Sequence, residues 1–393
     1  MKLAKLSLAA IVVAGLATSS FAADTLADAF KNGKVKGDIK ARYWDRDNGA
    51  KSEDIVMFGA VLGYVTDSFN GFKLGLTFQA NSSPFIDDTA KPFYQKNEYG
   101  PGAVLSESYL QYSMGKTTAK LGRQFISSPL VAGSGSRVIR QSFEALTFVN
   151  TDLPQTTLIA GYVDKFQNRT DGAGNIGEFK QVGTDGAYTI AAINKSIANL
   201  TVTAAWAQVV NSSDHYYLEG AYAGKTDSFT YGLAAQYALI SFDAAGIKDA
   251  DAFGLKASMG MGAFSGFVAY ATTGKDTNIG SGFGLGGGTD NLFTNNIIGA
   301  NDGSAYSRDT NSYAARLQYA IAKNARVGAQ YLYTDSGVTI AGQDDTTNSI
   351  DLFGSYAFEG ALKGFSIDVV YEDAEDRAGV NKSELRFNTT YKF

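Results

Sequence analysis

The chain has 393 residues, with 39 acidic and 34 basic side chains, one histidine and no cysteine. The lack of cysteine excludes disulfides, thiolate chemistry and cysteine-based metal sites. The acidic balance gives no reason to expect a nucleic-acid partner. Glycine, phenylalanine and tyrosine are abundant, with 44, 25 and 22 copies, against 5 prolines. This profile is typical of strands, aromatic belts and tight turns.

The first 22 residues have the layout of a secretory signal. Lys2 and Lys5 form a charged region, residues 6–17 an apolar region, and residues 20–22 a Ser-Phe-Ala cleavage site. An apolar run of about a dozen residues is shorter than the ~20 needed to cross hydrocarbon as a helix. We therefore predict cleavage after Ala22. Loss of two lysines makes the mature net charge −7.

No second apolar stretch of spanning length follows, so the exported chain is either soluble or crosses a membrane by strands. From Val35 to Trp44, apolar residues at odd positions alternate with charged ones at even positions. The same alternation returns at residues 72–79, 109–114, 253–259 and 325–333. One such strand fits a soluble sandwich as well as a membrane barrel.

The spacing of the strands favours the barrel. Short turns, such as residues 67–71 and 115–116, alternate with long connections, such as residues 81–104, 167–183, 273–309 and 334–348. Short periplasmic turns and long outer loops are typical of outer-membrane barrels. The predicted fold is an all-β, antiparallel, up-and-down transmembrane barrel over residues 35–393, preceded by a short periplasmic leader over residues 23–34.

Eighteen strands are predicted, and sixteen remain an alternative; either number leaves an aqueous channel. The eighteen centres lie near Ile39, Ala60, Leu76, Tyr109, Leu121, Leu146, Ile159, Ile190, Ala204, Leu218, Leu233, Leu255, Val268, Leu317, Val327, Leu352, Val369 and Phe387. The last strand places five residues on one face, ending at Phe393. This end resembles the signal by which the barrel-assembly machinery recognises its substrates in the Gram-negative outer membrane.

The chemistry of a pore lies in its constriction, where a few charged side chains set the ion preference. Residues 116–140 contain five cations and no acid. The five are Lys116, Lys120, Arg123, Arg137 and Arg140. If the connection over residues 124–142 folds inward, its guanidinium groups attract carboxylates. A solvated external loop is the alternative.

The alternation also predicts which strand residues face the lumen. The predicted basic track consists of Lys36, Lys40, Arg42, Lys256, Arg316, Arg326 and Arg386. The predicted acidic wall consists of Asp38, Glu107, Asp351, Asp368 and Glu384. Opposed walls of this kind give a transverse field that orients dipolar solutes. An ordinary wet-lumen position is the alternative for each of these residues.

A family resemblance rests on the segment Ala-Lys-Leu-Gly-Arg-Gln at residues 119–124, followed by Pro129, Ser-Arg-Val-Ile at residues 136–139, and Phe143. This order resembles the strand, constriction loop and following strand of OprD-type porins, including epsilonproteobacterial members. The resemblance implies an eighteen-stranded barrel with a basic path for small carboxylated solutes, and Arg137 is the first position to carry over. Arg140 stands where the family usually has proline, and Ala145 where glycine is common, which puts the loop geometry and the substrate in doubt.

Other functions have weaker support. His215 is the one histidine available for a Ser-His-Asp arrangement, so we predict neither an enzyme nor a cofactor or metal site. The glycine-rich run at residues 280–288 is predicted to be a flexible extracellular loop and not a phosphate site. Acidic runs such as residues 372–376 could bridge lipopolysaccharide through divalent cations, or be solvated loop charge. An active transporter is disfavoured, because no plug of ~100 residues precedes the first strand.

The prediction is therefore a porin for passive diffusion of small hydrophilic solutes and ions, favouring carboxylated ones. A surface adhesin, acting through the loop over residues 273–309, is the rival interpretation. The sequence leaves open the sign of selectivity, a divalent cation in the channel, and monomer against homotrimer.

Overall fold

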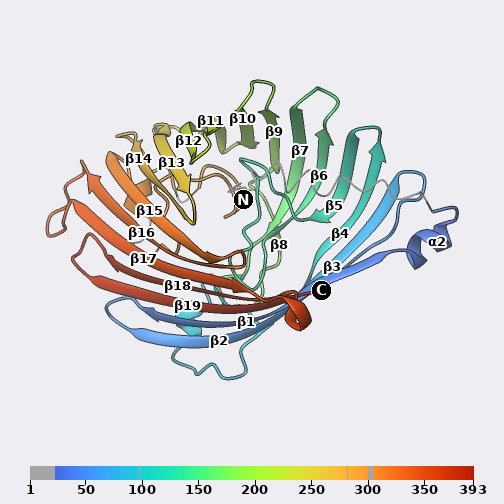
Figure 1. Ribbon diagram of the computed structural model, residues 1–393, viewed down its shortest axis with the longest axis horizontal. Coiled ribbons are helices and arrows are strands. Elements are labelled where there is room, and N and C mark those ends of the chain that lie inside the picture. The colour runs from blue at the N-terminus through green and yellow to red at the C-terminus, as the bar shows by residue number, and fades with distance from the viewer. Residues whose placement is uncertain (1–22, 97, 281, 300–303) are drawn as a thin grey trace.

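The structure is a computed structural model that describes residues 23–96, 98–280, 282–299 and 304–393. The predicted signal over residues 1–22 lies outside the described residues. Figure 1 shows one sheet curved into a ring around a lumen. Along the wall each strand pairs antiparallel with its neighbour, and β1 pairs with β19 to close the ring. The transmembrane β-barrel and its all-β class are confirmed.

Eighteen of the nineteen labelled strands form the barrel wall, since β7 pairs directly with β9 and β8 is a three-residue strand beside β7. Every predicted strand centre falls within a wall strand. The bounds are β1 Lys34–Asp47, β2 Ser52–Val65, β3 Phe72–Ser82, β4 Gly102–Met114, β5 Thr117–Gln124, β6 Ser142–Asn150, β7 Thr156–Gln167, β8 Phe179–Gln181, β9 Ala187–Asn194, β10 Leu200–Val209, β11 Ser213–Lys225, β12 Thr230–Phe242, β13 Ala250–Met261, β14 Phe264–Thr273, β15 Thr310–Ala322, β16 Ala325–Ser336, β17 Thr346–Ala357, β18 Phe365–Glu375 and β19 Asn381–Lys392.

Strand alternation places apolar side chains outside and polar ones inside. Ile39, Leu233 and Leu317 are more than half exposed on the outer surface. Gln236 and Gln330, from strands of the same wall, are buried inside. An apolar band on the outside replaces water contacts with lipid, while the polar inner face needs a wet or hydrogen-bonded interior.

A short helix precedes the wall. Helix α2 (Leu26–Lys31) begins after Thr25, whose hydroxyl oxygen accepts a hydrogen bond from the backbone N–H of Asp28 at 3.1 Å. The backbone N–H of Asp67, in the first short turn, donates to the carbonyl of Ala29 at 2.9 Å, which ties the leader to the rim. Within the described residues, no helix is long and apolar enough to cross a membrane.

The interior is filled by long connections that fold inward. Ile126, Leu130 and Val131 pack with Phe283 and Leu292 in one buried cluster. Their partners on the inner wall are small, for example Ala238, Ala252 and Ala271. Small wall residues leave the volume that the loop side chains occupy, so these connections pack as part of the protein core.

The glycine-rich run is therefore not the flexible extracellular loop that we predicted. Leu285 pairs with Val131 in a parallel bridge, and a Cβ atom on Gly284 would lie 2.1 Å from the carbonyl oxygen of Leu130. The glycines allow two loop backbones to approach closely inside the barrel, a use that composition alone does not distinguish from flexibility. The same packing takes residues 283–286, within the segment on which the adhesin interpretation depended, into the interior of the barrel.

Candidate constriction and permeation path

The connection over residues 125–141, here the constriction loop, is fastened to the wall formed by β1, β2 and β3. Gln79 holds it by two hydrogen bonds, accepting from the backbone N–H of Arg140 and donating to the carbonyl of Arg140, both at 2.8 Å. Arg42 donates to the carbonyl of Ser136 at 2.8 Å. On β2, a Cβ atom at Gly59 would lie 2.0 Å from Val138, so glycine is required for this contact. The loop thus crosses the lumen to the first strands.

The connection between β14 and β15, here the long loop, is fastened to the opposite wall. Gln236 on β12 accepts from the N–H of Phe293 at 2.7 Å and donates to the carbonyl of Asn291 at 3.1 Å. Gln330 on β16 donates to the carbonyl of Asn295 at 3.0 Å. Backbone groups inside a barrel need such partners, because an unpaired buried group costs about 1–3 kcal/mol.

The far part of the long loop is held by two buried carboxylates. Asp351 on β17 and Glu372 on β18 lie directly opposite one another and are fully buried. Glu372 accepts from the backbone N–H groups of Ile298 and Gly299 at 3.1 and 2.8 Å. Asp351 accepts from the N–H of Ile297 at 3.3 Å. Successive backbone N–H groups form an anion-binding concavity, and here the anions belong to the barrel wall.

Three guanidinium groups gather around one buried indole at the tip of the constriction loop. The centroid of Trp44 lies 4.2 Å from the guanidinium carbon of Arg386, 4.7 Å from that of Arg137 and 5.8 Å from that of Arg42. Trp44 has no exposed surface. Each cation placed over an aromatic ring gains about 0.5–2 kcal/mol, more where water is excluded. The three groups come from β1, β19 and the constriction loop.

A single carboxylate partly balances this cluster. Glu384 is 2.9 Å from both Arg46 and Arg386 and accepts from the indole N–H of Trp44 at 3.0 Å. Among the described residues, one buried N–H nitrogen of each guanidinium has no hydrogen-bond partner: Arg42 Nη1, Arg137 Nε and Arg386 Nε. The cluster therefore keeps both excess positive charge and unused donors.

The loop arginines of this region lie in a desolvated, like-charged setting. Burial lowers the pKa of Arg137, and the guanidinium groups of Arg386 and Arg169 lower it further. Burial likewise lowers the pKa of Arg169 to about 10, although Glu98 opposes the change. Arg169 therefore stays protonated at neutral pH, and it brings a further positive charge to the cluster.

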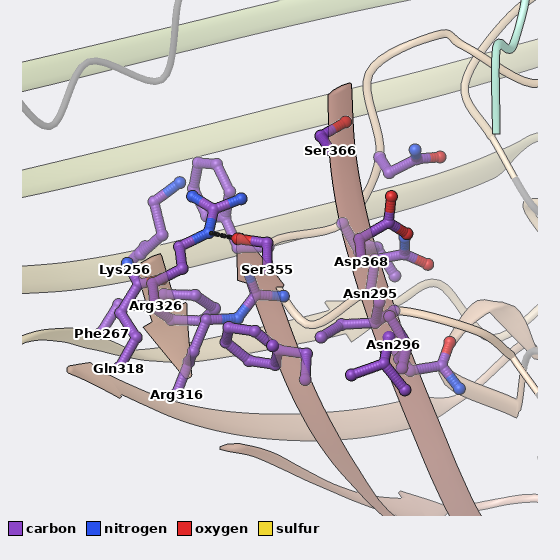
Figure 2. A pocket seen from close by; sticks show the side chains of 18 of the residues that line it. Lys256, Phe267, Asn295, Asn296, Arg316, Gln318, Arg326, Ser355, Ser366 and Asp368 are labelled. Carbon is purple, nitrogen blue, oxygen red and sulfur yellow. Dashed lines mark hydrogen bonds between the residues drawn. The ribbon is translucent and has the colours of Figure 1, made fainter. Parts of the chain in front are cut away.

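Between the long loop and the short-turn end of the barrel lies a cavity of about 990 Å³. Figure 2 shows Arg316 and Arg326 on one side of it and Asp368 with Asn295 on the other. Arg316 donates through Nε to Gln330 at 2.8 Å and lies 5.2 and 5.5 Å from the rings of Phe267 and Phe353. Arg326 donates through Nε to Ser355 at 3.1 Å. Among the described residues, neither forms an ion pair with a carboxylate.

Comparison with known proteins decides the family. The family model described as "outer membrane porin, OprD family" matches residues 96–393, which is more than half of the chain. The chain belongs to the OprD family of outer membrane porins. No curated protein sequence matches it. The predicted family and the Gram-negative outer membrane are confirmed.

Solved porins share this fold over nearly the whole chain. OccK9 (OpdG) of Pseudomonas aeruginosa has a TM-score of 0.80 at 14% identity, covering 93% of this chain and 99% of its own. OccAB4 of Acinetobacter baumannii has a TM-score of 0.78 at 17% identity, covering 92% and 98%. Pseudomonas aeruginosa OpdK, solved with vanillate, has a TM-score of 0.75 at 14% identity, covering 93% and 99%.

The structure of this porin distributes the predicted cations over several places. Arg42, Arg137 and Arg386 come together at Trp44. Arg316, Arg326 and Asp368 line the cavity of Figure 2.

Two smaller groups complete the lumen positions. Lys120 lies 4.2 Å from the ring of Tyr109, and Arg140 lies 4.4 Å from that of Phe125. Glu107 is buried nearby and accepts from Thr77 at 2.7 Å. Lys40 pairs with Asp38 at 3.4 Å. These residues form local pairs along the wall and do not join the Trp44 cluster.

Arg123 is a wrong prediction. It shares a face of β5 with Leu121, which is 59% exposed, so it lies outside the lumen, and it pairs with Glu144 at 2.8 Å. Lys120 faces inward, and Arg123 lies three residues further along the strand, so period-two alternation places Arg123 on the opposite, outer face. The prediction followed the positive charge of the segment instead. Asp351 was predicted to line the open lumen, but the long loop covers it. Glu372, from the acidic run at residues 372–376, also lies under that loop.

Sequence reasoning missed Trp44, Arg169 and the role of Glu384 as a shared acceptor. Trp44 occupies an inward position of β1, so its phase could have identified it. Arg169 lies in a long connection without periodicity and carries no such signal. His215, the one candidate for catalysis, contacts the carbonyl of Phe283 through Nδ1 at 2.8 Å and not a carboxylate. Among the described residues, no group of three or more histidine, cysteine or acidic residues is placed to hold a metal.

Proposed function

We propose that this porin is a passive diffusion channel for small hydrophilic solutes that favours carboxylates, and that the Trp44 cluster is its selective step. The observation that carries the proposal is the convergence of Arg42, Arg137 and Arg386 where the constriction loop meets β1, with Glu384 as the one carboxylate in an ion pair with these three arginines among the described residues. A guanidinium group binds a carboxylate through charge-assisted hydrogen bonds, bidentately where geometry allows. Fixed positive charge in a narrow, poorly hydrated passage attracts anions even in an acidic protein.

The cavity beyond the long loop suits the release of the solute. Three cations line it, and three carboxylates balance them, so attraction for an anion is weaker there than at the cluster: the cations are Lys256, Arg316 and Arg326, and the carboxylates are Glu219, Asp290 and Asp368. Conduction requires sites that bind well enough to admit a solute and weakly enough to release it. OpdK, a protein of the same fold, has been solved with vanillate, which is a carboxylate.

The outer surface and the chain ends support further partner proposals. Outer-membrane lipid and lipopolysaccharide surround the apolar band, and Phe393, which is 53% exposed, is offered to the barrel-assembly machinery. The backbone N–H groups of Phe393 and Gly37 each donate to the carbonyl of the other residue at 3.1 Å, so Phe393 is part of the closed wall. A homotrimer and a monomer both fit this surface.

Single-channel recording in planar bilayers tests the proposal. We expect stable conductance steps and a reversal potential on the anion side under a KCl gradient. Arg137→Ala should lose most of that preference, because the passage then carries less positive charge. Arg123→Ala is the matched control, since its guanidinium lies on the outer face. Equal reversal potentials for Arg137→Ala and wild type would remove the cluster from the proposal, and a folded but silent barrel would remove the channel.

A further inference from the structure

Three like charges converge on Trp44, although they repel one another. Arg386 lies directly opposite Trp44 in the pairing of β19 with β1, Arg42 is two residues from it on the same face, and Arg137 arrives on the constriction loop. With no compensating interaction, long side chains in such a position would spread apart into the lumen. The structure holds all three within 5.8 Å of one ring centroid.

The indole compensates for this repulsion in an unusual way. The negative face of an aromatic ring attracts guanidinium groups without accepting their N–H hydrogen bonds in the plane. A carboxylate in the same place would attract them more strongly, but it would neutralise the charge and occupy the donors. With the ring in this place, one buried nitrogen of each guanidinium has no hydrogen-bond partner among the described residues. These nitrogens are Arg42 Nη1, Arg137 Nε and Arg386 Nε.

The ring itself is fixed from several sides. Its N–H donates to Glu384 at 3.0 Å, and Tyr94 packs against it with ring centroids 5.8 Å apart. The hydroxyl of Tyr94 donates to the carbonyl of Trp44 at 3.1 Å. Glu384 also holds Arg46 and Arg386 at 2.9 Å, so one carboxylate orients the indole and one of its cations together.

We propose that Trp44, oriented by Glu384, is the positioning residue that sets the carboxylate selectivity of this channel, because it holds three guanidinium groups together without neutralising their charge. This inference rests on the proposed function and deepens it. Trp44 is fully buried and need not touch the solute. Its contribution is to the position of the three charges, which separates its role from that of the arginines themselves.

Two substitutions at Trp44 separate the ring from the bulk of the side chain. Trp44→Phe keeps an aromatic face but loses the N–H to Glu384, whereas Trp44→Leu keeps apolar volume and loses the face. We expect block of the chloride current by sodium glutamate to weaken about fivefold in Trp44→Leu, as for the loss of cation–π contacts. In Trp44→Phe it should weaken about twofold or less.

A matched control comes from the second basic region. Phe353→Leu removes a ring that lies 5.5 Å from Arg316, outside the Trp44 cluster, and should leave glutamate block unchanged. Circular dichroism and resistance of the barrel to SDS verify folding of each variant. A purely structural role would lower conductance or folding yield in both Trp44 variants alike, and it would not make the phenylalanine variant behave like wild type.

Fluorescence provides a second readout that does not depend on current. The chain has two tryptophans, so a Trp206→Phe background leaves Trp44 as the one emitter. Sodium glutamate should change its emission with the same concentration dependence as block, and Arg386→Ala should abolish the change.

The outcomes separate the two proposals. If Arg386→Ala weakens block while folded Trp44→Leu blocks like wild type, the role of Trp44 is overturned and the proposed function stands. If glutamate block is unchanged in both Arg137→Ala and Arg386→Ala, both proposals are overturned. If glutamate block weakens about fivefold in Trp44→Leu and stays close to wild type in Trp44→Phe, both proposals are supported.

Discussion

The channel contains two groups of arginines that are built from the same residue types but differ in what their neighbours leave free. At Trp44, three guanidinium groups share one ring and each retains an unpaired buried N–H nitrogen. In the cavity of Figure 2, Arg316 and Arg326 each use Nε for a neutral side chain of the wall, and Asp368 lies across from them. The comparison teaches that the same residue types can leave different amounts of charge without compensation. The selectivity proposed above follows that difference and not the number of cations.

The largest effect is expected from double substitutions, one in each group of arginines. Arg137→Ala with Arg386→Ala should abolish the anion preference, because it removes two of the three charges at the narrow site. Arg316→Ala with Arg326→Ala should reduce it by less than half, since the wide cavity and Asp368 already weaken the field there. Reversal potentials under a KCl gradient measure both. Equal losses in the two double variants would show that the whole basic path acts as one unit.

The next effect concerns the support of the long loop. Glu372→Gln should release residues 297–299, because the charge-assisted bonds to two backbone N–H groups are lost at a cost of about 1–3 kcal/mol. Current noise in the open state should increase, with little change in the mean reversal potential. Ser349→Ala is the control, since Ser349 is buried on β17 and its hydroxyl has no partner among the described residues. Unchanged noise in Glu372→Gln would mean that other contacts hold the loop.

A smaller effect is expected from salt. Raising KCl from 0.1 to 1 M shortens the screening length from about 10 to about 3 Å, which weakens attraction by exposed charges more than by buried ones. The anion preference of wild type should fall but persist, because the Trp44 cluster is largely shielded from solvent. The anion preference of the double variant, Arg137→Ala with Arg386→Ala, should be near zero at both concentrations. Complete loss in wild type at 1 M would indicate that exposed lumen charge, and not the cluster, sets the preference.

The smallest effect is expected on the outer face. Arg123→Ala breaks the pair with Glu144, whose side chains are 33% and 23% exposed, and a pair this exposed contributes about 0–1 kcal/mol. Conductance and reversal potential should match wild type, and thermal denaturation in detergent should shift by a few degrees at most. A change of selectivity in this variant would contradict the outward position of Arg123.

The barrel was predictable from the sequence because its physical cause is local. Alternation with period two and the contrast of short turns with long loops place every wall strand, and both can be read from neighbouring residues. The inward phase of Arg42, Arg316, Arg326 and Arg386 follows from the same rule.

The inner loops were not predictable in the same way. Their positions depend on contacts between segments far apart in the chain, such as Leu130 with Leu285 and Arg42 with Ser136. A run of glycines reads equally as flexibility and as close packing, and nothing local separates the two. The charge of residues 116–140 drew attention to a loop that folds inward, but it overrode the alternation at Arg123, which is how one outer residue entered the predicted site.

The seam between β1 and β19 has a consequence for the proposed selective site. Trp44 and Arg42 lie on the first strand of the wall, and Glu384 and Arg386 lie on the last, where Trp44 pairs with Arg386. These two strands are the first and the last of the wall, and their pairing closes the ring. The proposed selective site is therefore complete only in the closed barrel, because its residues come from both strands of the seam.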